Sequence, residues 1–246
     1  MALKEDIEKE VDSVISTVWA DRDGRDVPAA DDVALGNGAV KIRAAMLYAD
    51  LAESTRIAMT LPPWMAAEIA KAFLATSCRI IRYHGGHIRS FDGDRVMGVF
   101  VGDDMCVRAA KAAMQIYWAV VYVLRPKFGN YPTFKASGLT ISHGVGIDVG
   151  DVFVARTGIR RNNDLVWVGR APNVAAKLAS VRDEPYATYI THAAFAELNE
   201  ETYWKNPTDR SARELLWESW TWPEIPPGME KEIYRSNWTW RPPSGV

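Results

Sequence analysis

Hydrophobic residues recur at a helical period in several parts of the chain. Near the N-terminus the apolar positions within residues 3–18 follow the pattern of an amphipathic helix: Leu3, Ile7, Val11, Val14, Ile15 and Val18. A longer helix, broken at Pro62-Pro63, is predicted within 53–84, and another over 103–125. Residues 21–28 are polar and rich in turn formers, so a linker is expected there.

Short apolar runs predict strands between these helices. Two of them are joined by Asp92-Gly93, which is a strong hairpin signal. A short helix is expected from Pro172 to Val181. The predicted strands cover 42–49, 88–91, 95–100, 143–149, 151–157 and 164–168. Helices and strands mixed in this way, with hairpins as well as crossovers, indicate an α+β sandwich.

Composition and charge narrow the class of protein. The 246 residues are 48% hydrophobic and 24% charged, which is typical of a globular enzyme. Lys+Arg 29 against Asp+Glu 31 gives a net charge of -2 and no general attraction to nucleic acid or anionic lipid. No apolar run could span a bilayer, and Cys78 and Cys106 are too few for a disulfide framework. We therefore expect a cytoplasmic protein with neither nucleic acid nor membrane as a partner.

Two acidic residues at predicted strand ends are candidates for metal binding. Asp50 ends the first buried strand directly before a helix, and Asp94 lies at the hairpin. Helix capping or turn formation explains either residue alone. Together, beside a helix N-terminus whose N–H groups face phosphate, they could hold divalent ions that neutralise a triphosphate.

Four sequence blocks resemble those of the class III nucleotide cyclases. That family carries F-x-D-I-x-G-F-T, then Gly-Gly with a G-D hairpin, then R-x-G-I-x-x-G, and then G-x-x-V-N-x-A-x-R. The counterparts occur in the same order as YADLAEST at 48–55, GGHIRSFDGDRVM at 85–97, HGVGIDVG at 143–150 and GRAPNVAAK at 169–177. The resemblance implies a homodimeric α+β fold with a ferredoxin-like βαββαβ core and an extra hairpin.

The resemblance also implies metal and catalytic residues. Asp50 and Asp94 match the metal-binding carboxylates, and the Leu51 carbonyl matches a further ligand to two divalent cations, Mg²⁺ or Mn²⁺. Asn173 matches the residue that orients the ribose. Lys177 stands where the family usually has an arginine that stabilises charge on the α-phosphate, and Lys lacks the planar fork of Arg. In the family this last pair comes from the opposite chain.

The substrate-binding residues follow from the same blocks. The loop from Ala52 to Thr55, which includes Ser54, matches the segment that holds the β- and γ-phosphates. Arg56 either contacts a phosphate or is a solvated helix residue. Tyr48 either stacks near the ribose or base or is a core aromatic.

The base-reading positions match neither purine pattern. Adenylate cyclases of this class use Lys and Asp, and guanylate cyclases usually use Glu with Cys or Ser. This chain has Ser90 and Val166, with Asp164 close enough for an alternative alignment. No residue at these positions therefore favours ATP or GTP.

A closer resemblance spans nearly the whole chain. LYADLAEST, RSFDGDRVM, RAPNVAAKL and the Trp-rich IYRSNWTW resemble the bacterial pyrimidine cyclases of the Pycsar anti-phage system. Those enzymes make cyclic UMP or cyclic CMP, so the resemblance implies a pyrimidine cyclase, with conversion of UTP to 3′,5′-cyclic UMP favoured. The product is a second messenger for a separate cyclic-nucleotide-sensing effector. A cytidylate cyclase, a divergent adenylate or guanylate cyclase, and an inactive nucleotide-binding homologue remain as alternatives.

Three segments are predicted along the chain. Residues 1–35 form an N-terminal helix and linker, 36–200 the cyclase catalytic domain, and 201–246 a C-terminal extension packed on the domain or the dimer seam. The extension holds six of the ten tryptophans: Trp204, Trp217, Trp220, Trp222, Trp238 and Trp240.

Overall fold

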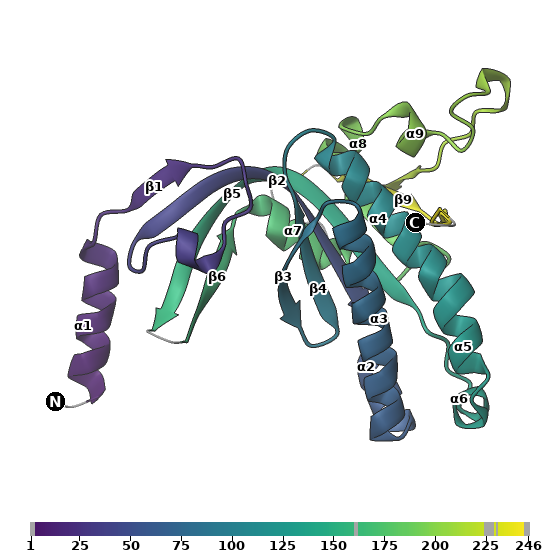
Figure 1. Ribbon diagram of the computed structural model, residues 1–246, viewed down its shortest axis with the longest axis horizontal. Coiled ribbons are helices and arrows are strands. Elements are labelled where there is room, and N and C mark those ends of the chain that lie inside the picture. The colour runs from purple at the N-terminus through teal and green to yellow at the C-terminus, as the bar shows by residue number, and fades with distance from the viewer. Residues whose placement is uncertain (1–2, 160–161, 224–228, 230, 244–246) are drawn as a thin grey trace.

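The computed structural model describes residues 3–159, 162–223, 229 and 231–243 (Figure 1). Its α-helices are α1 (Leu3–Ser16), α2 (Ser54–Thr60), α3 (Pro63–Tyr83), α4 (Met105–Ala119), α5 (Arg125–Gly129), α6 (Pro132–Ser137), α7 (Arg170–Leu178), α8 (His192–Ala196) and α9 (Glu200–Tyr203). Its strands are β1 (Ala20–Asp23), β2 (Gly38–Leu51), β3 (His87–Asp92), β4 (Arg95–Phe100), β5 (His143–Ile159), β6 (Asn162–Val168), β7 (Thr188–Thr191), β8 (Glu218–Thr221) and β9 (Glu232–Ser236).

The centre of the sheet is an antiparallel unit in the order β3-β4-β2-β5. Helices α2 and α3 connect β2 to β3, and α4 lies between β4 and β5 in the chain, which gives the βαββαβ order of a ferredoxin-like core. Strand β6 folds back on β5 as the extra hairpin. The predicted α+β fold with its ferredoxin-like core is therefore confirmed.

Both faces of the central sheet are covered, and β2 contributes side chains to each. Leu47 and its neighbours on one face pack against α3 and α4, for example at Phe73 and Met114. Met46 packs on the opposite face against α7 at Ala171. Because successive residues of a strand point to opposite faces, a strand buried on both sides reads as a continuous apolar run.

Several predicted elements differ from those in the structure. The expected linker at 21–28 contains most of β1, which pairs in parallel with the start of β2. The expected helix 103–125 gives way to a π-helical turn at Val120–Leu124 before α5, and α6 was not predicted. The two strands expected on either side of Gly150 are one strand, because β2 pairs with β5 continuously from Ala39 opposite Ala155 to Leu51 opposite His143.

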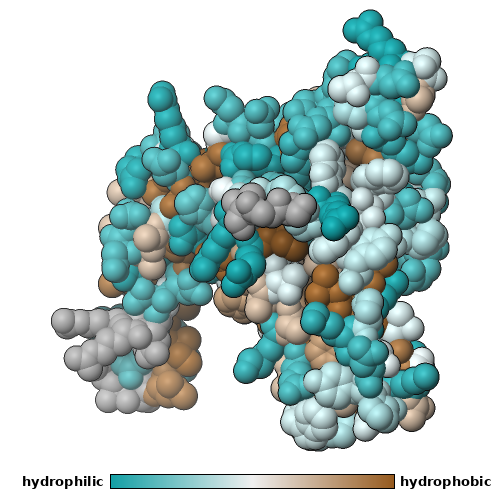
Figure 2. Space-filling model, turned by 45° about the vertical axis from the view of Figure 1, so that its right-hand side comes forward, coloured by the Kyte–Doolittle hydropathy of each residue, from teal (hydrophilic) through white to brown (hydrophobic). Residues whose placement is uncertain are grey.

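Helix α1 has no buried residue. All of its predicted apolar positions are exposed, from Leu3 at 75% to Ile7 at 51%. In Figure 1 the helix projects away from the sheet, and an exposed apolar patch lies in the corresponding region at the lower left of Figure 2. Asn37 attaches the end of the helix by donating to the carbonyl oxygens of Val14, at 3.0 Å, and Thr17.

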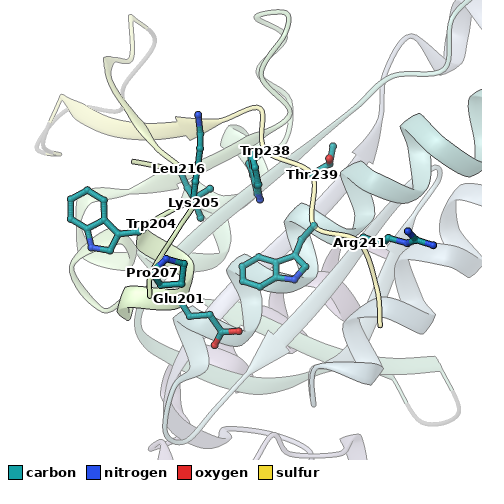
Figure 3. A pocket seen from close by; sticks show the side chains of 9 residues that line it. Glu201, Trp204, Lys205, Pro207, Leu216, Trp238, Thr239 and Arg241 are labelled. Atoms are coloured by element: carbon teal, nitrogen blue, oxygen red, sulfur yellow. The ribbon is translucent and has the colours of Figure 1, made fainter. Parts of the chain in front are cut away.

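The C-terminal extension contributes strands to the same sheet. Strand β9 pairs with β7, and β8 pairs with β9. Trp217 and Trp222 are buried. Trp204, Trp238 and Trp240 line a surface pocket of about 470 Å³. Figure 3 labels the first two of these residues. No predicted site residue lines that pocket, so we assign these indoles to packing.

No helix in the described part of the chain is long and apolar enough to cross a membrane.

His143 is a buried, uncharged residue at the start of β5. Its ring lies between Phe73 and Tyr117, with centroids 5.7 Å from each, and its Nε2 has no partner among the described residues. Burial, with the nearby charges of Arg125 and Arg182, lowers the pKa of His143 to about 3. The unfolded chain, with an ordinary histidine pKa of about 6.5, binds the extra proton between these values, so stability falls as pH falls below about 6.5.

We predict that the free energy of unfolding falls by about 1.4 kcal/mol because of His143 when the pH is lowered from 7.5 to 5.5. Urea unfolding of the wild type and of His143→Gln at both pH values measures this, and the variant should lose less stability by about that amount. His192→Gln, at an exposed histidine, should keep the wild-type difference. Equal losses in wild type and His143→Gln would contradict the prediction.

Candidate active site

The candidate site lies where β2 ends. Asp50 pairs across the sheet with Arg95 of β4 on one side and Gly144 of β5 on the other. The chain then leaves the sheet, with the Ala52 N–H donating to the Ser142 carbonyl at 2.8 Å. Glu53 takes a left-handed conformation with φ of 53°, and α2 begins at the next residue. This turn starts the predicted phosphate loop directly after the end of β2.

Two arginines hold the carboxylate of Asp50, whose side chain is 12% exposed. Arg95 Nε donates to Oδ1 at 3.1 Å, and Arg182 Nη2 donates to Oδ2 at 2.7 Å. Arg95 also donates from Nη2 to Ser180 Oγ at 2.9 Å. Charge-assisted bonds of this kind fix the orientation of a carboxylate. Both oxygens of Asp50 therefore face guanidinium groups.

Asp94 lies at the tip of the β3–β4 hairpin, directly before Arg95. Gly93 supplies the positive φ of 60° that the turn requires. The Asp94 carbonyl accepts from the Leu51 N–H at 3.5 Å, which ties the hairpin tip to the end of β2. Asp94, Leu51, Ser54 and Thr55 all line one cavity of about 400 Å³. The structure thus brings these four predicted site residues together, whereas Asp50, directly before Leu51 in the chain, does not line this cavity.

These residues fit divalent cations that prefer oxygen ligands. The donors are two carboxylates and the main-chain carbonyl of Leu51, and such hard donors suit Mg²⁺ or Mn²⁺ better than Zn²⁺. No group of three or more His, Cys, Asp or Glu that could hold a metal occurs within the described residues. Cations here would therefore need phosphate oxygens or water to complete their shells, as Mg²⁺ commonly does with nucleotides.

Tyr48 and Ser90 lie in one row across the sheet. Both are cross-strand neighbours of Met97, so they share the face against which α7 packs. The Tyr48 hydroxyl donates to Met97 Sδ at 2.9 Å, and the ring is half-buried. Burial raises the pKa of Tyr48, with Arg95 opposing and Asp92 adding to the shift. Tyr48 is therefore a neutral, fixed aromatic two residues before Asp50 on the same face of β2.

The remaining predicted residues do not line the cavity. Arg56 is exposed and forms an ion pair with Glu53 at 3.0 Å. Asn173 and Lys177 lie one turn apart on the exposed side of α7, and Asn173 Nδ2 donates to the Gly169 carbonyl at 3.0 Å. Within one chain, the catalytic pair is thus separate from the cavity that Asp94 lines.

Arg95 and Arg182 are functional residues that the sequence motifs did not indicate. A signal for Arg182 was present in the third block. When Gly146-Ile147 is aligned with G-I of R-x-G-I-x-x-G, Gly144 takes the place of the arginine. A missing arginine in an otherwise retained block indicates that another cation could stand nearby, although it does not say which one.

Comparisons with known proteins give close relatives along the whole chain. No family model matches it. The chain is 42% identical over 244 residues to a uridylate cyclase from Rhodovulum sp. (strain MB263), covering 99% of each protein. It is 40% identical to a uridylate cyclase from Xanthomonas perforans and 36% identical to one from Burkholderia cepacia, each over 98% of this chain and 99% of the relative.

Solved structures share the fold at lower identity. A bacterial light-regulated adenylyl cyclase matches 81% of this chain and 52% of its own, with a TM-score of 0.66 and 20% identity. The adenylyl cyclase CyaB from P. aeruginosa matches 80% of this chain and 95% of its own, with a TM-score of 0.64 and 19% identity. The guanylyl cyclase Cya2 gives a TM-score of 0.61 at 16% identity, over 80% of this chain and 91% of its own.

The two carboxylates should differ in their effect on stability. Asp50→Ala leaves two partly buried guanidiniums without their acceptor, which should cost about 1–3 kcal/mol. The Asp94 side chain has no hydrogen-bond partner among the described residues, so Asp94→Ala should change stability by less than about 0.5 kcal/mol. Urea unfolding in EDTA measures both values. A larger loss in Asp94→Ala than in Asp50→Ala would show that the arginine contacts do not stabilise the fold.

Proposed function

The chain belongs to the uridylate cyclase family, and from this premise we propose that it converts UTP to 3′,5′-cyclic UMP and pyrophosphate. The observation that carries the proposal is the grouping of Asp94, Leu51, Ser54 and Thr55 around one cavity at the end of β2, where Asp50 directly precedes Leu51. The family relationship and the class III cyclase fold together make the protein a nucleotide cyclase, a phosphorus–oxygen lyase.

The reaction is an in-line displacement within one nucleotide. The ribose 3′-oxygen forms a bond to the α-phosphorus and gives up its proton, while the bond to pyrophosphate breaks. Asp50, Asp94 and the Leu51 carbonyl hold two divalent cations, Mg²⁺ or Mn²⁺. When bound, these cations supply charge neutralisation and a lower pKa for the 3′-hydroxyl. Ser54 and Thr55 orient the β- and γ-phosphates at the start of α2.

Asn173 and Lys177 complete the site from a second copy of the chain. Asn173 orients the ribose, and Lys177 offsets charge that develops on the α-phosphate. Their exposed position on α7, outside the cavity, supports a contribution to a neighbouring protomer. The exposed apolar side chains of α1 also support a homodimer, because apolar surface of this kind is commonly covered by association.

Base choice rests on shape at Tyr48. Its ring is held by the bond to Met97 and lies in one row with Ser90, so a smaller pyrimidine fits where a purine would meet the ring. Ser90 and the exposed Val166 lack the paired donors and acceptors that select adenine. The name shared by the three relatives favours uracil over cytosine, and CTP is the second candidate.

We place this reaction in the cytoplasm, where both unpaired thiols, Cys78 and Cys106, stay reduced. The full-length resemblance supports a role in anti-phage defence. The cyclic nucleotide then acts on a separate effector that senses it.

A competition assay tests the substrate. With equal UTP, CTP, ATP and GTP and excess Mn²⁺, cyclic UMP should exceed each other cyclic product at least tenfold, which is about 1.4 kcal/mol of transition-state discrimination. Excess EDTA, or Asp94→Ala, should stop all product formation. Cyclic AMP or cyclic GMP as the main product would refute the pyrimidine assignment and leave the cyclase assignment intact.

Mixing experiments test the shared site. Asp94→Ala and Lys177→Ala should each be inactive, and their mixture should regain activity because a heterodimer contains one site with every residue. Asp94 is preferred to Asp50 for this test because its side chain forms no hydrogen bond or ion pair with the described residues. If the two variants exchange subunits and stay inactive, the catalytic pair and the carboxylates belong to one chain.

A further inference from the structure

The guanidinium of Arg182 lies at the edge of the candidate site, where the family resemblance assigns no residue. Arg182 follows α7 and precedes β7, and its side chain is 34% exposed beside Asp50. We infer that Arg182 is a phosphate-binding residue of the nucleotide site, contributed by the chain that carries the metal-binding carboxylates. The inference rests on the proposed function and extends it to a further residue.

The loop after α7 fixes this guanidinium without help from Asp50. Arg182 Nη1 donates to the carbonyl oxygens of Ala179, at 2.5 Å, and Val181, at 2.8 Å. These bonds use both hydrogens of Nη1 and so set the plane of the group. Nη2 faces Asp50, and Nε has no acceptor among the described residues. The edge formed by Nε and Nη2 is thus the part of the fork that can bind an oxyanion in bidentate fashion.

Gly144 makes room for this arrangement. A Cβ at residue 144 would lie 2.5 Å from Arg182 Nη1 and would also collide with the Ala179 carbonyl oxygen. Any side chain on β5 here would therefore displace the guanidinium. Gly144 also occupies the arginine position of R-x-G-I-x-x-G. The strand therefore has no arginine at this position, and the guanidinium of Arg182 lies where a Cβ at residue 144 would meet it.

The charges around Asp50 indicate an anionic ligand. The Asp50 carboxylate faces the guanidiniums of Arg95 and Arg182, so these three side chains together carry a net positive charge. Divalent cations at Asp50 would increase that charge, and the carboxylate oxygens would then turn from Arg182 to the cations. The triphosphate is the anion that can satisfy both the cations and the released guanidinium.

Arg182 differs from Arg95 and Lys177 in what it can offer. Arg95 is held at both ends, by Asp50 through Nε and by Ser180 through Nη2, so it positions the carboxylate. Lys177 is a point charge without a planar fork. Arg182 supplies that fork on the chain whose Ser54 and Thr55 hold the β- and γ-phosphates in the proposed function, so we assign it to these two phosphates.

Binding measurements on the full-length protein test the inference. We compare the wild type with Arg182→Gln and Arg182→Lys. The control is Arg213→Gln, because Arg213 likewise bonds a carboxylate, Glu200 at 3.0 Å, and a carbonyl, Pro207 at 2.7 Å, in the C-terminal extension. The probes are 3′-deoxy-UTP with excess Mg²⁺, which cannot cyclise, and Mn²⁺ alone. Titration calorimetry follows the nucleotide, and electron paramagnetic resonance follows free Mn²⁺.

Substitution of Arg182 should weaken the binding of the nucleotide but not the binding of Mn²⁺. Arg182→Gln should weaken 3′-deoxy-UTP binding at least tenfold and raise KM for UTP, and Arg182→Lys should fall between it and the wild type. The same Arg182→Gln protein should bind Mn²⁺ at least as tightly as the wild type, because a cation that competes for Asp50 is gone. Arg213→Gln should match the wild type with both probes.

Other outcomes separate the two proposals. Unchanged or tighter 3′-deoxy-UTP binding in Arg182→Gln, with cyclic UMP still formed by the wild type, overturns the role of Arg182 alone. Joint weakening of Mn²⁺ and nucleotide binding also overturns it, since that result indicates only a structural role. Wild-type protein that cyclises no triphosphate overturns the proposed function itself.

Discussion

The long antiparallel pairing of β2 with β5 determines where the functional residues lie. Its register sets Asp50 opposite Gly144 and Tyr48 opposite Gly146. Both glycines face close neighbours: Arg182 and Ala179 approach Gly144, and the backbone of α7 at Ala175 approaches Gly146. A shift of one residue would turn every side chain of β2 to the other face and separate the carboxylate from its arginines. The site is therefore a consequence of this register.

The sequence predicted those elements whose signals are local and strong. The apolar run of β2, the Asp92-Gly93 hairpin and the proline break between α2 and α3 each act through a few neighbouring residues, and each appears in the structure. The grouping of Asp94 with Leu51, Ser54 and Thr55 followed from the family blocks. The polar residues of β1 predict a linker, and the strand forms because it pairs in parallel with β2.

Contacts between distant segments lay beyond sequence reasoning. Asp50 and Arg182 are 132 residues apart, and nothing near Arg182 in the sequence marks it as a partner of β2. The continuous strand β5 was divided because Gly150-Asp151 resembles a turn, while pairing with β2 overrides that preference. Whether Asn173 and Lys177 act on a second chain depends on an association that one chain's residues do not determine.

The antiparallel pairing of β7 with β9 limits where this enzyme can be truncated or fused to another protein. In many signalling proteins a catalytic unit is a portable cassette, linked to sensors through flexible connectors and separable from them. Here β9, in the C-terminal segment, pairs with β7, and β7 pairs with β5. Ser236 of β9 is buried, and its hydroxyl donates a hydrogen bond to the Leu216 carbonyl oxygen. Removal of the tail would strip a strand from the catalytic sheet and expose an unpaired edge. The C-terminal segment is thus an inseparable part of the catalytic body, and fusion partners are better attached beyond it than in its place.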